Sequence, residues 1–136
     1  MENNSSFILK NPSNYRGVFC LWVLMITTVL VFSQPQLKFI DTKKNFGFVK
    51  KGEVTHIEFN FTNKGNEPLI IKETKVECSC TTVDFPKEPI LPGQSSKITV
   101  TFDTKSVYDR QDRMVEVISN ATKSIQKIRF KGVVLK

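Results

Sequence analysis

The chain has 136 residues, of which 40% are hydrophobic and 24% are charged, a composition that suits one globular domain and excludes a disordered or low-complexity polypeptide. Its formal net charge is +7 at pH 7. The lysines are spread along the chain without a dense basic tract, so we expect solvated outer faces and no nucleic-acid partner.

The N-terminal region contains an uncharged apolar run over residues 18–32, preceded by Lys10 and Arg16 and followed by Ser33. At 15 residues the run is shorter than the roughly 20 of a membrane-spanning helix and fits the roughly 7–15 of a signal-peptide core. We therefore predict that residues 1–33 are a signal peptide. The alternative is an uncleaved membrane anchor, a helix formed by residues 18–32.

Both alternatives place residues 34–136 outside the cytoplasm, in the periplasm, the cell envelope or the medium, where thiols meet an oxidising environment. In residues 34–136, apolar and polar side chains alternate, with turn residues about every ten positions, and no helical period of adequate length occurs. This pattern predicts an all-β, immunoglobulin-like antiparallel β-sandwich of about seven strands. The strand segments expected are 37–40, 45–49, 55–61, 68–76, 97–102, 114–118 and 125–135.

The clearest strand, residues 55–61, places Ile57, Phe59 and Phe61 on one face and His56 on the other. His56 is therefore predicted to be an exposed strand residue and not a ligand or a catalytic base. Burial of aromatic rings offsets much of the cost of ordering the chain. The predicted core contains five phenylalanines: Phe59, Phe61, Phe85, Phe102 and Phe130.

Three connections can be predicted from turn residues. Residues 63–66 (Asn-Lys-Gly-Asn) are typical of a hairpin turn. Residues 86–93 contain three prolines and a glycine, which excludes a central strand and suggests the crossing from one sheet to the other. Residues 103–113 lack an apolar period and are predicted to be a loop.

Several motifs resemble those of a bacterial domain of unknown function that occurs in secreted proteins and carries a Cys-Gly-Cys-Thr signature. The resemblance covers about residues 40–134, and Ser79 stands where the signature has glycine. It implies an immunoglobulin-like fold of the hydin-like and major-sperm-protein-like kind, which serves in protein interaction. The motifs are Phe46-Gly47-Phe48-Val49, Gly52, Phe59-x-Phe61-x-Asn63-x-Gly65-x-x-Pro68-Leu69-x-Ile71, Cys78-Ser79-Cys80-Thr81, Pro92-Gly93, Ile98-x-Val100-x-Phe102 and Ser119-Asn120.

Cys78 and Cys80 are the two cysteines that remain if the N-terminal segment is removed. In an extended strand their Cα atoms would be about 6.6 Å apart, close to the upper limit for a disulfide, so a bridge requires a local bend. Three interpretations stay open: half-buried structural cysteines, an easily reduced disulfide suited to thiol exchange, and a soft-metal site for Cu(I) or Zn(II). Zinc wants four ligands, and two thiolates with one histidine fall short.

We find no phosphate-binding loop, no nucleophile and base pair, and no cofactor motif in the sequence. The leading hypothesis is a non-catalytic, exported module that binds or supports another envelope or secreted protein through a sheet edge or its loops. The rival is an extracytoplasmic thiol redox or soft-metal-binding protein acting through Cys78 and Cys80. The oligomeric state and the identity of the partner are not predicted.

Overall fold

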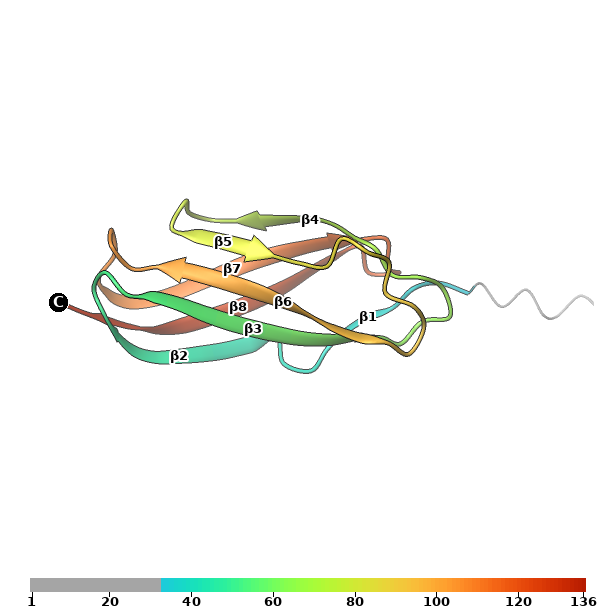
Figure 1. The fold of residues 1–136 in the computed structure, drawn as a ribbon, viewed down its shortest axis with the longest axis horizontal. Coiled ribbons are helices and arrows are strands. Elements are labelled where there is room, and N and C mark those ends of the chain that lie inside the picture. The colour runs from blue at the N-terminus through green and yellow to red at the C-terminus, as the bar shows by residue number, and fades with distance from the viewer. Residues whose placement is uncertain (1–32) are drawn as a thin grey trace, which may run out of the picture. The chain divides into compact units, whose positions relative to one another are not determined.

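The computed structural model describes residues 33–136, which form eight β-strands in two four-stranded sheets (Figure 1). The predicted signal peptide (residues 1–33) and the alternative anchor (residues 18–32) lie outside the described residues, apart from Ser33. Between residues 33 and 136 there is no helix of the length and apolar character needed to cross a membrane. The strands are β1 (Leu37–Phe39), β2 (Lys43–Lys50), β3 (Val54–Asn63), β4 (Ile71–Val76), β5 (Thr81–Asp84), β6 (Ser95–Asp103), β7 (Asp109–Ser119) and β8 (Ile125–Leu135).

The strand order is β1-β3-β6-β5 in the first sheet and β2-β8-β7-β4 in the second. Every pair of neighbouring strands is antiparallel except β2 and β8, which run parallel. The prediction of a β-sandwich is thus confirmed, and the prediction that it is antiparallel throughout is wrong at this one pair. Alternation reports which face of a strand is buried but not the direction of its neighbour. The intervening strands between β2 and β8 supply the long crossover that parallel pairing needs.

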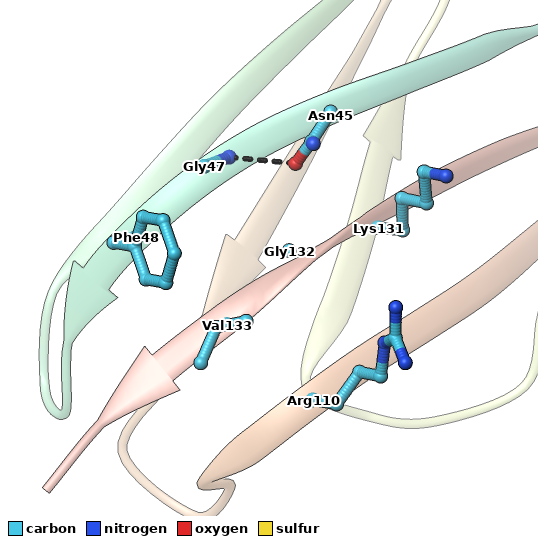
Figure 2. Close-up of a pocket in the computed structure, with 7 residues that line it drawn as sticks. All are labelled: Asn45, Gly47, Phe48, Arg110, Lys131, Gly132 and Val133. Atoms are coloured by element: carbon cyan, nitrogen blue, oxygen red, sulfur yellow. Dashed lines mark hydrogen bonds between the residues drawn. The ribbon is translucent and has the colours of Figure 1, made fainter.

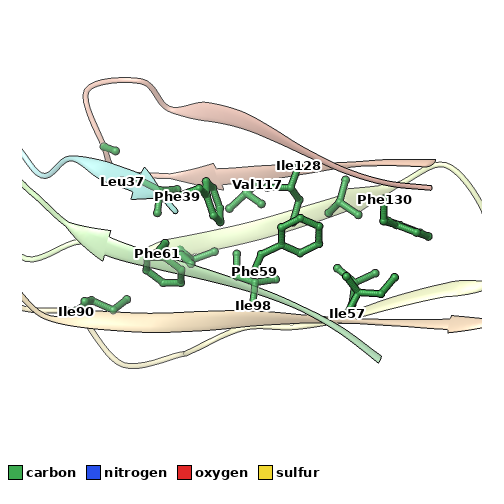
Figure 3. Packing of buried hydrophobic residues seen from close by; sticks show 14 of the residues in the cluster. Leu37, Phe39, Ile57, Phe59, Phe61, Ile90, Ile98, Val117, Ile128 and Phe130 are labelled. Atoms are coloured by element: carbon green, nitrogen blue, oxygen red, sulfur yellow. The ribbon is translucent and has the colours of Figure 1, made fainter. Parts of the chain in front are cut away.

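The core lies between the two sheets and is built from their inward-facing side chains (Figure 3). Phe59, Phe61, Phe102 and Phe130 are fully buried, as predicted. Phe102 of the first sheet and Phe130 of the second meet edge to face with ring centroids 5.3 Å apart, so this pair joins the two layers. The fifth predicted core ring, Phe85, is only partly buried because it follows the end of β5 at the edge of the first sheet.

The predicted loop over residues 103–113 is too long, because β7 already begins at Asp109 and pairs with β8 from there. The reason is a polar residue in an inward position. Gln111 is buried, and its amide donates a hydrogen bond of 2.8 Å to the carbonyl oxygen of Tyr108. A buried amide that is satisfied in this way breaks the apolar alternation without breaking the strand.

The crossings between sheets also differ from the prediction. The proline segment 86–93 connects β5 to β6 within the first sheet, whereas the cysteine segment between β4 and β5 crosses from the second sheet to the first. Residues 63–66 do not close a hairpin, because β3 and β4 belong to different sheets. The Asn63 side chain is fully buried there, donating to the carbonyls of Glu67 and Ile90 and accepting from the amides of Gln36 and Gly65.

Candidate functional site

The first candidate site is the cysteine turn, residues 77–80, which joins β4 to β5. Cys78 and Cys80 are linked by a disulfide, with their Cα atoms 5.3 Å apart. This separation is shorter than that of an extended strand, so the bend that such a bridge requires is present. Ser79 is exposed. Among the described residues only Asp109 combines a non-glycine side chain with a positive φ, so serine fits the backbone at position 79 without strain.

Two backbone hydrogen bonds hold the turn independently of the sulfur atoms. The amide of Thr81 donates to the carbonyl oxygen of Cys78 at 3.2 Å, and the amide of Asp103 donates to that of Cys80 at 2.9 Å. Both cysteines are half-buried, and Cys80 packs against the hydrophobic core. The chain therefore fixes Cys80 against β6 and the core, a contact that Cys78 does not share.

The hydroxyl oxygen of Thr81 lies next to both sulfur atoms. It is 3.5 Å from Sγ of Cys78 and 3.8 Å from Sγ of Cys80, and Thr81 is only 5% exposed. A hydroxyl in this position can donate a weak hydrogen bond to either sulfur.

In the oxidised form recorded here, neither sulfur is a thiolate that could bind a metal ion. Within residues 33–136, no three His, Cys, Asp or Glu side chains come together as a potential metal site. His56 is exposed on the outer face of β3, as predicted, and its Nδ1 lies 3.0 Å from Oγ1 of Thr101.

The second candidate site arises from a β-bulge in β2. The pairing of β2 with β8 shifts between Asn45 and Gly47, so Phe46 is the extra residue. Its ring points inward, onto Phe102 and Phe130 at centroid distances of 5.6 and 6.2 Å. In a regular strand Phe46 and Phe48 would share one face, but the bulge reverses the alternation and turns Phe48 to the outside. Phe48 is 75% exposed.

Two glycines make this bulge feasible. Gly47 adopts a positive φ of 77°, and its amide donates to Oδ1 of Asn45 at 2.9 Å. Gly132 lies beneath the Phe46 ring, where an added Cβ would approach Cζ of Phe46 to 2.6 Å. The ring of Phe46 therefore occupies the space that a side chain at position 132 would need.

A shallow groove lies on the outer face of the second sheet at this point (Figure 2). Phe48 on β2, Val133 on β8 and Arg110 on β7 form one row across three strands, since Val133 pairs with both of the others. We call this feature the Phe48 groove. Its lining residues are Asn45, Gly47, Phe48, Arg110, Lys131, Gly132 and Val133.

The Phe48 groove and its surroundings carry an excess of positive charge. Asp112, the acidic residue of the neighbouring hollow, is bound by Nε of Arg129 at 2.7 Å. Arg110 and Lys131 form no ion pair with any carboxylate of residues 33–136. Lys43 and Lys44 line the same hollow. The groove thus combines an exposed aromatic ring with cations that have no carboxylate partner within the sheet.

The sequence predicted Cys78 and Cys80 as candidate site residues, and the structure brings them together. It did not predict the Phe48 groove. One signal could have indicated it: Gly47 stands inside a strand pattern between two phenylalanines, and an isolated glycine there suggests a bulge. The contribution of Arg110 could not have been found, because the strand that carries it was predicted to be a loop.

Residues 37–134 match a family described as protein of unknown function, DUF1573. The chain belongs to this family. The comparison of this DUF1573 protein with curated proteins gave no match. The family membership agrees with the resemblance seen in the sequence, and the CxC pair of that signature is present here as the Cys78–Cys80 disulfide.

Several solved structures are similar to this DUF1573 protein. A protein of unknown function from Porphyromonas gingivalis W83 has 19% sequence identity and a TM-score of 0.66, with 77% of this chain and 50% of that chain covered. A PapD-like domain of human CEP192 has 10% identity and a TM-score of 0.60, with 99% of both chains covered. The protease VesB of Vibrio cholerae has 15% identity and a TM-score of 0.54, with 87% and 35% covered.

This chain therefore spans half of the Porphyromonas protein and about a third of VesB. Identities this low establish the fold alone. The predicted immunoglobulin-like fold class is confirmed at the level of the fold, because the similar structures include a PapD-like domain.

Proposed function

We propose that this DUF1573 domain is a non-catalytic protein-binding module outside the cytoplasm, and that it binds an extended acidic segment of another exported protein in the Phe48 groove. The observation that carries the proposal is the outward position of Phe48, which is 75% exposed directly after the bulge in β2. Covering such a ring on binding is worth about 1.5–3 kcal/mol. Bulges commonly re-aim a side chain next to functional sites.

The chemistry of the groove supports an acidic partner. Arg110 and Lys131 offer cationic donors beside the ring, and Arg can bind a carboxylate through two parallel hydrogen bonds. Lys43 and Lys44 extend the positive surface along the sheet. An extended segment with carboxylates and one apolar side chain would match these cations and the ring at the same time.

The position of β2 supports an extended partner. β2 is an edge strand, paired only with β8, so its second edge faces no other strand of residues 33–136. At the Lys50 end of this edge, the backbone amide and carbonyl already bond the side chains of Glu53 and Thr104. Lys43, Lys44 and Lys50 lie along this edge, and charges of this kind oppose indiscriminate pairing of strand edges. An acidic segment would be attracted by these lysine charges, whereas a neutral strand would gain nothing from them and a basic strand would be repelled.

The fold adds support through its similarity to a chaperone. The chaperone DraB of Escherichia coli has 11% identity and a TM-score of 0.51, with 74% of this chain and 54% of that chain covered. Catalysis by His56 has little support: its ring is exposed and lies 3.0 Å from the hydroxyl of Thr101, but among residues 33–136 no hydrogen bond to a third side chain orients the ring as a catalytic base requires.

Selection of the full chain against a library of short random peptides tests this proposal. We expect the selected peptides to be acidic and to contain an apolar residue. Their affinity should fall about tenfold or more in Phe48→Ala, which corresponds to the loss of about 1.5–3 kcal/mol. The affinity should also fall in Arg110→Ala and with rising salt.

Ile40→Ala is the matched control, because Ile40 is 70% exposed but follows β1 of the first sheet. It should leave the affinity unchanged. Selected peptides without acidic residues, or equal loss in the Ile40 and Phe48 variants, would contradict the proposal.

A further inference from the structure

We propose that the cysteine turn is a thiol–disulfide exchange site, which accepts two electrons from a dithiol of another molecule. This activity is separate from binding in the Phe48 groove. The two features lie at opposite lateral edges, since β2 and β4 are the two edge strands of the second sheet. The β4–β5 connection and the end of β2 both lie toward the end of the sandwich that carries the C-terminus (Figure 1).

The first argument concerns what the disulfide contributes to folding. In the chain-entropy model, the stabilisation by a disulfide grows with the length of the loop that it closes. This bond joins residues only two positions apart, so it removes little conformational freedom from the unfolded chain. The turn is already held by the hydrogen bonds to the carbonyls of Cys78 and Cys80. The disulfide is therefore expected to contribute little to the stability of the fold.

The second argument concerns access. The turn is exposed at Ser79, its cysteines are half-buried, and the edges of β4 and β5 beside it are not covered by another strand of the described residues. Cys80 packs against the core and Cys78 does not. Because Cys80 packs against the core, we expect an attacking thiolate to reach Sγ of Cys78, with Sγ of Cys80 as the leaving group.

The reaction can be written with a dithiol as the reductant. One thiolate of the dithiol attacks Sγ of Cys78, the bond between Cys78 and Cys80 breaks, and Cys80 leaves as a thiolate. The second thiolate of the dithiol then attacks the dithiol sulfur that is bonded to Sγ of Cys78. This closes a disulfide within the dithiol and releases the Cys78 thiolate. The dithiol is oxidised to a disulfide, and Cys78 and Cys80 become two thiols after taking up two protons.

Thr81 is a positioning residue in this scheme. Its hydroxyl oxygen lies 3.8 Å from Sγ of Cys80 and 3.5 Å from Sγ of Cys78, so it can donate a hydrogen bond to the thiolate that leaves and to the one that is released. Hydrogen bonds to an ionised acceptor are stronger than those to a neutral one. The backbone bonds of the turn need not break when the sulfurs separate.

Equilibration of the full chain with glutathione buffers tests the proposal, in a Cys20→Ser background so that only the turn contributes thiols. Alkylation followed by mass spectrometry reads the fraction of reduced pair, and circular dichroism reads the fold. We expect the pair to pass reversibly from oxidised to reduced within the glutathione range while the fold is retained. A pair that stays oxidised across that whole range would overturn the proposal, because structural disulfides resist the glutathione pool.

Single variants test the direction of attack. With glutathione disulfide, Cys80→Ser should form a mixed disulfide at Cys78 several times faster than Cys78→Ser does at Cys80. Equal rates, or the reverse order, would overturn the assignment of Cys78 as the attacked sulfur. Thr81→Val should slow exchange and Thr81→Ser should restore it, whereas wild-type exchange in Thr81→Val would overturn the role of the hydroxyl.

Discussion

At the scale of single residues, the Phe48 groove depends on two glycines that are required for different reasons. Gly132 is required for space, because the Phe46 ring occupies the position of a Cβ there. At Gly47 an added Cβ would meet no atom within 4 Å, but the residue has a φ of +77°, a conformation that residues with side chains disfavour. Together they let Phe46 point inward and Phe48 outward.

Gly132→Ala should lower the free energy of unfolding by about 1–3 kcal/mol, because the new methyl group must displace the ring of Phe46 in a packed core. Chemical denaturation of the full chain measures this. A midpoint equal to that of the unmodified protein would show that the ring does not fill this space.

Gly47→Ala should lower the free energy of unfolding by about 1–2 kcal/mol for a backbone reason alone. Gly47→Asn should cost less, since asparagine tolerates a positive φ better than other side chains. If both variants unfold at the same denaturant concentration as the unmodified protein, the bulge does not need a left-handed residue at this position.

At the scale of elements, alternation predicted most strands but not their partners. It located β3, β6 and β8 well, because each buries a run of alternating apolar side chains. It missed the start of β7, where the buried residue is Gln111, and the fact that β2 runs parallel to β8. Both the bulge in β2 and the crossing at the cysteine turn depend on contacts between distant segments, which a local pattern does not report.

Replacement of both cysteines of the turn by serine should lower the free energy of unfolding by less than about 2 kcal/mol, because the disulfide closes a very short loop. Thermal unfolding of the double variant, compared with the oxidised protein, gives this difference. Failure of the double variant to fold would instead assign the disulfide a structural role.

At the scale of the whole molecule, stability depends on the inner faces of the two sheets, and the proposed binding depends on the outer face of the second sheet. The inner faces carry the fully buried phenylalanines, and the pair Phe102 and Phe130 joins the layers. The outer face of the second sheet carries Phe48 and the cations around it. The fold follows from the inner pattern, whereas the proposed function depends on the outer one.

Replacement of phenylalanine by alanine should therefore change the free energy of unfolding by very different amounts at two positions. Phe102→Ala should lower the free energy of unfolding by about 3–5 kcal/mol, because the ring is fully buried. Phe48→Ala should change it by no more than about 0.5 kcal/mol. Comparable losses at both positions, measured by denaturation, would contradict the division between the faces.

The central claim is that the Phe48 groove binds an acidic, extended segment, and chemical-shift mapping by nuclear magnetic resonance tests it most directly. A selected acidic peptide is titrated into the isotope-labelled full chain. We expect the shifted amides to lie on β2, β7 and β8 around Phe48, Arg110 and Lys131, and to stop shifting in Phe48→Ala. Shifts centred on the first sheet, or shifts that persist in Phe48→Ala, would contradict the claim.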